Sequence, residues 1–454
     1  MLKFLVENIW LDKYNARIPV TDQHGITAFK TEPDWEIING WLSCTLDVMT
    51  QVGQDGADGY AHEAGVRGLV EEYVQALKAA GAIRSASVER AFRTVQRHRL
   101  METFFCRGEQ GRVTVRHDPA RPRRADLEVI YADTALATRY TDGAPTSSSS
   151  APSLVAEMLE LLELREGMKV LEIGAGTGYN AALVAEIVGD QRLVVTVDNQ
   201  QDVVEQTRRL LAETGYLRIR VLARDGFQGI PEEGPFDRIV ATVGCSDLSP
   251  RWAEQLADGG LMLVPLEHAQ SHPLTAVRKQ DGELRGRFVG WTGFMPVRGP
   301  LQIEDMWSRG VVIPETREND ETDDVGEIMH EPGPRLAAHD DSCEQNGFMF
   351  FVALNDRRAS WTPDGTVRSW TPEGVGLSAG PDGWAGISTS GLWWWKDESL
   401  AREVDRLYRD WTARGRPTIR DYRVTFLPVK DERNTPPGGW QIERRFYREI
   451  VTAD

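Results

Sequence analysis

The residues with the clearest chemical potential lie in the segment VLEIGAGTGY, where an apolar run leads directly into Gly174, Gly176 and Gly178. Glycines permit a tight turn and let the backbone approach a ligand closely, and the free N–H groups of a helix that begins there attract it. This geometry suits either a dinucleotide or S-adenosylmethionine. The spacing is G-x-G-x-G, which departs from the G-x-G-x-x-G pattern of dinucleotide sites.

Acidic residues stand at three successive ends of predicted strands. Asp198 ends the strand after the glycine turn, where its carboxylate would accept both ribose hydroxyls of either cofactor. Asp225, followed by Gly226, ends the third strand, and such a residue lies beside the adenine in S-adenosylmethionine sites. Glu172 ends the first strand, near the expected methionine part of that cofactor. A glycine turn can serve packing alone and Asp commonly caps strand ends, but the agreement of all three positions predicts an S-adenosylmethionine site.

The elements that position these residues alternate along residues 154–267. Strand-like runs are MKVLEIG, RLVVTVD, IRVLARDG, FDRIVATVG and LMLVPL, and helical runs such as YNAALVAEIVG and VVEQTRRLLAETG separate them. Strands separated by helices of this length predict βαβ units and a mainly parallel sheet. Residues 65–101 predict two further helices, with Gly81 as the end of one and Ser85 or Ser87 as the N-cap of the next.

The flanking segments differ from this core. Residues 127–156 have an extended, loop-like pattern, and their serine run is typical of a linker. Residues 315–341 contain ten acidic and two basic residues, which indicates a solvated linker, although such a block would also suit a basic leader peptide. Residues 340–454 predict a small α+β module, with an apolar strand in FMFFVAL, a strand in GLWWW, a helix in ESLAREVDRLYRDWTARG and a closing strand in DYRVTFLPV.

The amino-acid composition excludes several classes of protein. The chain has 454 residues with 52 Lys+Arg against 69 Asp+Glu, a net charge of -17, which argues against a nucleic-acid partner. Four cysteines without a CxxC pair exclude a disulfide scaffold, and the absence of HExxH or clustered Cys and His predicts no metal. No signal peptide or spanning segment is evident, so we expect a cytoplasmic protein without a membrane partner. Nine of the 14 tryptophans follow residue 300, and Trp393–Trp395 are expected to divide between core and interface.

From about residue 65 to 300 the chain resembles the protein-L-isoaspartate O-methyltransferase family. The resemblance rests on YADTAL, SSSSAPSLVAEMLELL, VLEIGAGTGYNAALVAEIVG, ARDG, PFDRIVATVG and LADGGLMLVPL, together with the preceding helices. It implies an α/β, class I methyltransferase fold, a Rossmann-like doubly wound sheet, with S-adenosylmethionine as methyl donor. It also implies that Ser150 is the catalytic serine of the substrate loop.

The substrate loop departs from the family pattern. Ser148-Ser149-Ser150-Ala151-Pro152 replaces the usual T-I-S sequence, so Ser149 stands where the family has a bulky aliphatic residue, and Arg224 alters the usual G-D-G. The resemblance therefore implies a retained cofactor site and a changed substrate pocket. We expect Ser148, Ser149, Asp133 and Thr134 to contribute to that pocket.

These features predict carboxyl O-methylation of isoaspartyl or aspartyl residues in a peptide or protein, with the ester collapsing to a succinimide. Two alternatives stay open: tailoring of a ribosomally made, leader-bearing precursor peptide, as in extended lanthipeptide or graspetide branches of the family, and a non-catalytic peptide-binding scaffold. The predicted domains are an N-terminal extension (1–64), the catalytic domain (65–310), an acidic linker (311–342) and a Trp-rich module (343–454).

Overall fold

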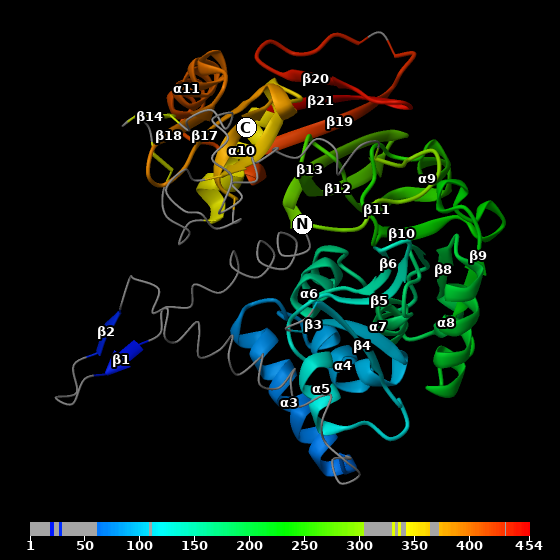
Figure 1. Ribbon diagram of the computed structural model, residues 1–454. Coiled ribbons are helices and arrows are strands. Elements are labelled where there is room, and N and C mark those ends of the chain that lie inside the picture. Colours follow the sequence, from blue (N-terminus) through cyan, green and yellow to red (C-terminus); the bar gives the residue numbers. More distant parts are fainter. Residues whose placement is uncertain are drawn as a thin grey trace. The chain divides into compact units, whose positions relative to one another are not determined.

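The computed structural model describes residues 19–21, 27–29, 61–108, 111–303, 329–331, 335–336, 342–363, 372–431 and 433–454. The chain divides into two compact units, Asn15–Gly226 and Phe227–Asp454, and each is described by itself (Figure 1). Near the start of the chain, β1 (Pro19–Thr21) and β2 (Thr27–Phe29) form an antiparallel pair.

Three helices of the first unit pack on one another: α3 (Glu63–Ala79), α4 (Ala86–Thr94) and α6 (Pro152–Leu161). In α3 the buried residues recur every three or four positions, as Val70, Val74 and Leu77 do, so one face of the helix enters the core. The helix ends just before Gly81, whose φ of 75° is the left-handed conformation that glycine adopts without strain. Both helices predicted from residues 65–101 are therefore confirmed.

The serine run, expected to be extended, is part of a β-sheet, which excludes the alternative of a flexible linker. The sheet has the order β4-β3-β5-β6, with β3 at Thr103–Gly108, β4 at Gly111–Arg116, β5 at Leu136–Thr141 and β6 at Ala144–Ser149. A short helix, α5 (Arg124–Ile130), precedes β5. Ser147 and Ser149 are buried while Ser148 between them is half-buried, which is the two-residue period of a strand. Pairing with β5, in the register Leu136↔Ser149, provides the order that a serine run lacks in isolation.

The predicted βαβ units are confirmed in the first unit. Strands β7 (Val170–Ile173), β8 (Val194–Asp198) and β9 (Arg220–Ala223) run parallel, and the helices α7 (Tyr179–Val188) and α8 (Gln201–Glu213) connect them. All four residues of β7 are buried, as expected for a parallel strand covered on both faces. The carboxyl ends of these strands consequently lie at one edge, with the glycine turn at the end of β7.

In the second unit seven strands follow the order β20-β21-β19-β13-β12-β11-β10. Their bounds are β10 Phe236–Ala241, β11 Leu256–Pro265, β12 His272–Gln280, β13 Glu283–Thr292, β19 Tyr422–Pro428, β20 Trp440–Glu443 and β21 Tyr447–Ala453. Strands β10 and β11 are parallel and the later pairs are antiparallel. Helix α9 (Pro250–Gln255) is shorter than predicted, because the residues after Gln255 begin β11.

The apolar run FMFFVAL lies in a helix, α10 (Ser342–Asn355), where a strand was predicted. The ring of Phe350 packs against Phe288 of β13, at a centroid distance of 4.6 Å, while Phe348 packs against Trp411 of α11 (Glu398–Ala413) at 5.3 Å. Because α10 is in contact on two sides, the run FMFFVAL is apolar all round the helix. A run that is apolar at every position does not show whether its period is that of a helix or that of a strand. Helix α11 and strand β19 match the helix and the closing strand predicted from sequence.

The tryptophan-rich strands belong to a second, antiparallel sheet with the order β14-β18-β17-β16-β15. Their bounds are β14 Met329–Glu331, β15 Ala359–Pro363, β16 Pro372–Ser378, β17 Trp384–Ile387 and β18 Leu392–Trp395. Trp393 and Trp395 cluster with Trp384, whereas Trp394 packs against the core shared with α10 and α11. Adjacent tryptophans thus enter opposite faces of one sheet, and none of the three is fully exposed.

The predicted domain boundaries stay a prediction. Strand β19 pairs with β13, so residues of the C-terminal segment continue the sheet that contains β10 to β13. Most of the predicted N-terminal extension and most of the acidic linker lie outside the described residues.

Among the helices that the structure describes, none combines the length and the apolar run that a bilayer crossing requires. Within the same described residues, no three His, Cys, Asp or Glu side chains gather closely enough to bind a metal ion.

The N-cap of α4 gives a test of the fold. The Ser85 hydroxyl accepts a hydrogen bond from the Val88 N–H at 3.3 Å. We expect Ser85→Ala to cost about 1 kcal/mol, because a first-turn donor loses its partner, and to lower the melting midpoint by about 2–4 °C. Calorimetry measures the midpoint. Thr94→Ala, which removes a hydroxyl from the last turn of the same helix, is the control and leaves the midpoint near wild type; equal midpoints for both variants would contradict the assigned cap.

Candidate functional site

The glycine turn joins the end of β7 to the start of α7. Gly174, Gly176 and Gly178 have φ values of 103°, 49° and 81°, which side chains rarely adopt. The N–H of Gly174 donates to the Val197 carbonyl of β8 at 2.8 Å, so the turn is held against the neighbouring strand. A Cβ atom on Gly178 would lie 2.8 Å from the Thr207 side chain of α8, and glycine is therefore required for the helices to pack. The predicted strand–turn–helix arrangement is confirmed.

Glu172 is a buried carboxyl group at the end of β7. It is 1% exposed, and its Oε1 accepts a hydrogen bond from Asn180 Nδ2 of α7 at 2.7 Å. Its Oε2 is buried and has no hydrogen-bond partner in the described residues. Burial, which disfavours the charged form, raises the pKa of Glu172 to about 7. A buried acceptor without a partner is costly, and a ligand donor would relieve that cost.

The other two predicted acidic residues also lie at carboxyl ends of strands. Asp198 ends β8, and its carboxylate accepts hydrogen bonds from the Gln200 N–H at 3.1 Å and the Gly176 N–H at 3.4 Å. Asp225 is exposed and follows β9, while Gly226 is buried. A Cβ on Gly226 would lie 2.6 Å from Ile173 Cγ2, so the backbone after β9 approaches the end of β7 closely. The structure therefore brings the predicted cofactor residues to one edge of the parallel strands.

The serine strand β6 lies directly on the glycine turn. A Cβ on Gly176 would stand 3.1 Å from the carbonyl oxygen of Ser148, closer than most Cβ atoms approach a neighbour, so a side chain there would require a small displacement. Gln200, just before α8, donates through Nε2 to the Thr146 carbonyl at 2.9 Å and ties the same strand to the end of β8. Two segments separated by about 25 residues in sequence are thus adjacent: the predicted substrate loop and the predicted cofactor turn.

Arg97, which was missed in the sequence analysis, organises the substrate side of the site. The residue lies in a short 3₁₀ helix (Arg97–Leu100) and is completely buried. Its guanidinium donates to six acceptors. Five are backbone carbonyl oxygens and one is a hydroxyl: Ile130 O, Ala132 O (3.4 Å), Thr134 O (3.2 Å), Ser149 O (3.4 Å), Ser150 O (3.0 Å) and Ser149 Oγ (3.2 Å).

These bonds join the 130–134 turn to the end of the serine strand. In the described residues, Arg97 has no carboxylate partner, and its charge is satisfied only by oxygen dipoles and by the ring of Tyr179 at 6.0 Å. Guanidinium has five N–H donors in a fixed fork, which suits this binding of several carbonyls. A lone arginine inside a helical pattern carries no local signal for such a role, so Arg97 could not be identified from the sequence.

The predicted substrate residues occupy different environments around Arg97. Ser150 and Ser148 are half-buried, whereas Ser149 is 3% exposed and its hydroxyl accepts the hydrogen bond from Arg97. Asp133 accepts a hydrogen bond from the Ser153 N–H at 2.8 Å and so stabilises the first turn of α6. Thr134 contributes its carbonyl to Arg97. Their substrate-binding roles stay predictions.

Comparisons with known proteins agree with this arrangement. Residues 122–302 match the family model for protein-L-isoaspartate (D-aspartate) O-methyltransferase. The protein-L-isoaspartate O-methyltransferase of Methanopyrus kandleri is 37% identical over 231 residues, which are 50% of this chain and 91% of that protein. That of Pyrococcus horikoshii is 32% identical over 229 residues, 50% of this chain and 91% of its own. A solved protein-L-isoaspartate O-methyltransferase is similar with a TM-score of 0.47 at 26% identity, over 78% of this chain and 96% of its own.

The pKa of Glu172 gives a stability prediction with a definite sign. Between the ordinary value of 4.5 and about 7, the native protein keeps a proton that the unfolded chain releases. The contribution of Glu172 to the free energy of unfolding is therefore present at pH 4.5 and falls as the pH rises to 7, by about 3 kcal/mol in total. In Glu172→Gln this loss is absent.

We accordingly expect the stability of Glu172→Gln, relative to wild type, to increase steadily from pH 5 to pH 7.5. Denaturant titrations of the ligand-free proteins at several pH values measure this difference. Glu205→Gln, at an exposed position of α8, is the control, and its difference from wild type stays constant. A constant difference for Glu172→Gln as well would show that burial does not raise this pKa.

Proposed function

Because the chain belongs to the protein-L-isoaspartate O-methyltransferase family and has its class I methyltransferase fold, we propose that it methylates side-chain carboxylates of isoaspartyl or aspartyl residues in peptides or proteins. The observation that carries the proposal is the contact between the serine strand and the glycine turn, where a Cβ on Gly176 would stand 3.1 Å from Ser148 O. Methyl transfer needs donor and acceptor in contact, and these two segments are adjacent.

The residues at the strand ends fit S-adenosylmethionine, which supplies an electrophilic methyl group when it is bound. The glycine turn offers a backbone surface without side chains. Glu172 Oε2 is a buried acceptor without a hydrogen-bond partner among the described residues, suited to a cationic or N–H donor near the methionine part. Asp198 would hold the ribose hydroxyls, and Asp225 with Gly226 would flank the adenine.

The acceptor needs no general base. A carboxylate with a pKa near 4 is already ionised at pH 7, so the protein has only to position it and exclude water. Ser150, half-buried at the end of the serine strand, would donate a hydrogen bond to the substrate carboxylate and orient one oxygen. Arg97 holds the backbone of this residue through the Ser150 carbonyl, and hence limits the positions that the hydroxyl can take.

The charge of Arg97 adds an electrostatic contribution. Because no carboxylate in the described residues neutralises it, its positive potential extends to the serine strand, where a substrate carboxylate would lie. Interactions of this kind are strong where water is excluded. They favour binding of the anion, and the desolvated anion is the more reactive nucleophile.

The fate of the product distinguishes two versions of this function. In the methyl ester, the nitrogen of the following backbone amide would attack the ester carbonyl and displace methanol, which gives a succinimide. In repair this returns aspartate, whereas in peptide tailoring the succinimide or isoaspartate is itself the product. We keep tailoring as the second candidate, because half of this chain, including the strands β19 to β21, lies outside the region matched by the relatives from Methanopyrus kandleri and Pyrococcus horikoshii.

Transfer of a labelled methyl group tests the proposal directly. We expect purified protein to transfer the labelled methyl group from S-adenosylmethionine to an isoaspartyl peptide. In mild alkali the label should be released as methanol, because methyl esters hydrolyse under these conditions. A macrocyclic aspartyl peptide in a parallel reaction separates the two versions: a mass loss of one water on that peptide alone favours tailoring. Absence of labelling on both peptides, with S-adenosylmethionine binding retained in calorimetry, would contradict the proposed reaction and favour the scaffold alternative.

Ser150→Ala tests the positioning role. We expect kcat to fall by about 10- to 100-fold, the value of a hydrogen bond to a charged group, with unchanged affinity for S-adenosylmethionine in calorimetry. Thr146→Ala on the same strand, a half-exposed position, is the matched control and retains wild-type turnover. If Ser150→Ala turned over as fast as Thr146→Ala, Ser150 would have no role in the reaction.

A further inference from the structure

The four-stranded sheet of the first unit is basic. Its strands β3, β4, β5 and β6, of six residues each, contain four arginines and no aspartate or glutamate. The chain as a whole has the opposite balance, with 69 acidic against 52 basic residues. This sheet therefore departs from the charge of the rest of the chain, and no acidic residue of its own strands neutralises its arginines.

The strand register places a row of side chains on the outer face of this sheet. Phe105 of β3 pairs with Thr114 of β4 and with Ala137 of β5. Ala137 also pairs with Ser148 of the serine strand β6. Successive side chains of a strand point to opposite faces, and the residue before Phe105, Phe104, is buried in the core. The row from Thr114 to Ser148 therefore lies on the face away from the core.

An aromatic pair on this face holds an arginine side chain. The rings of Phe105 and Tyr140 meet edge to face at a centroid distance of 4.8 Å, and the Arg112 guanidinium lies 4.0 Å from the centroid of Tyr140. Both rings are half-buried, whereas Arg112 is exposed. Contact with a ring restricts a long side chain without neutralising its charge. The guanidinium is thus oriented and keeps its N–H groups for an anion.

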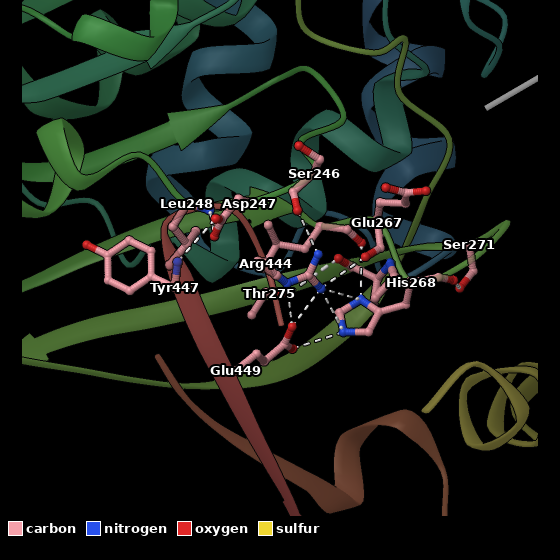
Figure 2. Close-up of polar contacts among 12 residues, drawn as sticks. Ser246, Asp247, Leu248, Glu267, His268, Ser271, Thr275, Arg444, Tyr447 and Glu449 are labelled. Carbon is pink, nitrogen blue, oxygen red and sulfur yellow. Dashed lines mark hydrogen bonds and ion pairs between the residues drawn. The ribbon is translucent and has the colours of Figure 1, made fainter. Parts of the chain in front are cut away.

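Other arginines of the chain are already bound to carboxylates. In the second unit, the Nε of Arg444 donates to Glu449 Oε2 at 2.6 Å, and Figure 2 shows this guanidinium surrounded by acceptors. Arg139 of β5 forms an ion pair with the first turn of α8. Among the residues that the structure describes, the side chains of Arg112 and Arg116 have neither an ion pair nor a hydrogen bond. Both are exposed, so their charges are available to a partner.

The spacing of the strands relates this face to the substrate serine. Neighbouring strands lie about 4.8 Å apart, so the row from Ser148 to Thr114 covers about 15 Å. Arg112 and Arg116 stand two residues before and after Thr114, on the same face. An extended peptide rises about 3.3 Å per residue. A peptide with its carboxylate at Ser150 therefore reaches these arginines with a residue about three to five positions away.

We propose that the arginine face, formed by Phe105, Arg112, Arg116 and Tyr140, binds acidic residues of the peptide substrate, about three to five positions from the residue that is methylated. This rests on the proposed function, in which Ser150 orients the reacting carboxylate. A guanidinium presents paired N–H donors that match the two oxygens of a carboxylate. The face selects substrates by charge and does not contact the reacting atoms.

Two matched isoaspartyl peptides test the proposal with the full-length protein. They carry either glutamates or glutamines at the positions three to five residues on both sides of the isoaspartate. We expect KM for the glutamate peptide to be about 3- to 10-fold lower in the wild type, the size of effect that exposed ion pairs have. The kcat values of the two peptides are similar, because the arginine face lies away from the methyl group. High salt reduces the difference in KM, since exposed charges are screened.

Variants of the arginine face identify the groups responsible. In Arg112→Gln/Arg116→Gln the two peptides have equal KM values, and in Arg112→Glu the glutamate peptide has the higher KM. Both positions are exposed, so the variants fold. Arg192→Gln is the matched control, because this exposed arginine of the same unit is already bound to Asp190, and it keeps the wild-type preference. Equal KM values in the wild type, or an unchanged preference in the double variant, would overturn the proposal.

Binding of fluorescent peptides, measured by anisotropy, separates this proposal from the proposed function. If neither peptide is methylated, the proposed reaction is contradicted, while tighter binding of the glutamate peptide that is lost in Arg112→Glu still supports the arginine face. Displacement of the peptide by single-stranded RNA, but not by the unlabelled glutamate peptide, would assign the face to a nucleic acid. Dimerisation that Arg112→Glu abolishes would assign it to a second copy of the chain. Either result overturns the proposal.

Discussion

A completely buried cation without a carboxylate partner is a severe constraint on a fold, and Arg97 imposes it on the first unit. The cost of moving a guanidinium out of water is offset only if all of its donors meet acceptors in good geometry. Here the acceptors are carbonyl oxygens of two separate segments, the 130–134 turn and the end of β6. Neither segment can move away without leaving buried donors unpaired, so their relative position is fixed before any ligand arrives.

The remaining features of the site follow from this fixed position. Once β6 is held, its Ser148 carbonyl lies so close to the glycine turn that a side chain at residue 176 would require a small displacement. The glycine turn is also bound to β8, through the Val197 carbonyl. Gly178 allows α7 to pack on α8. A preorganised arrangement of this kind favours methyl transfer, since the reaction depends on alignment and on exclusion of water rather than on acid–base chemistry.

The parts of the structure that were predicted correctly are those specified by local sequence. Continuous apolar runs separated by amphipathic helices identify β7 to β9, and the glycine spacing identifies the turn, because each of these depends on neighbouring residues only. The serine run was expected to be extended and loop-like, since its order as a strand comes from pairing with β5, 8 to 13 residues earlier. Helix α10 was mistaken for a strand, because contacts on two sides make it apolar all round. Arg97 was not identified, since its hydrogen-bond partners are 33 to 53 residues away in sequence and a single arginine does not indicate whether it is buried.

Strand β19 has a consequence for how this chain behaves when it is shortened. It covers the backbone edge of β13, and α10 covers the apolar face of the same strand at Phe288. A chain ending at residue 303, which would contain the whole family match, leaves both uncovered. Unpaired edges of this kind recruit strands from other molecules. In the full chain the outermost strand of the second unit is β20, which has four residues and exposes Gln441 and Glu443, so it offers little to a second copy. The C-terminal segment thus places a short strand with two exposed polar residues, in place of β13, at this edge of the sheet.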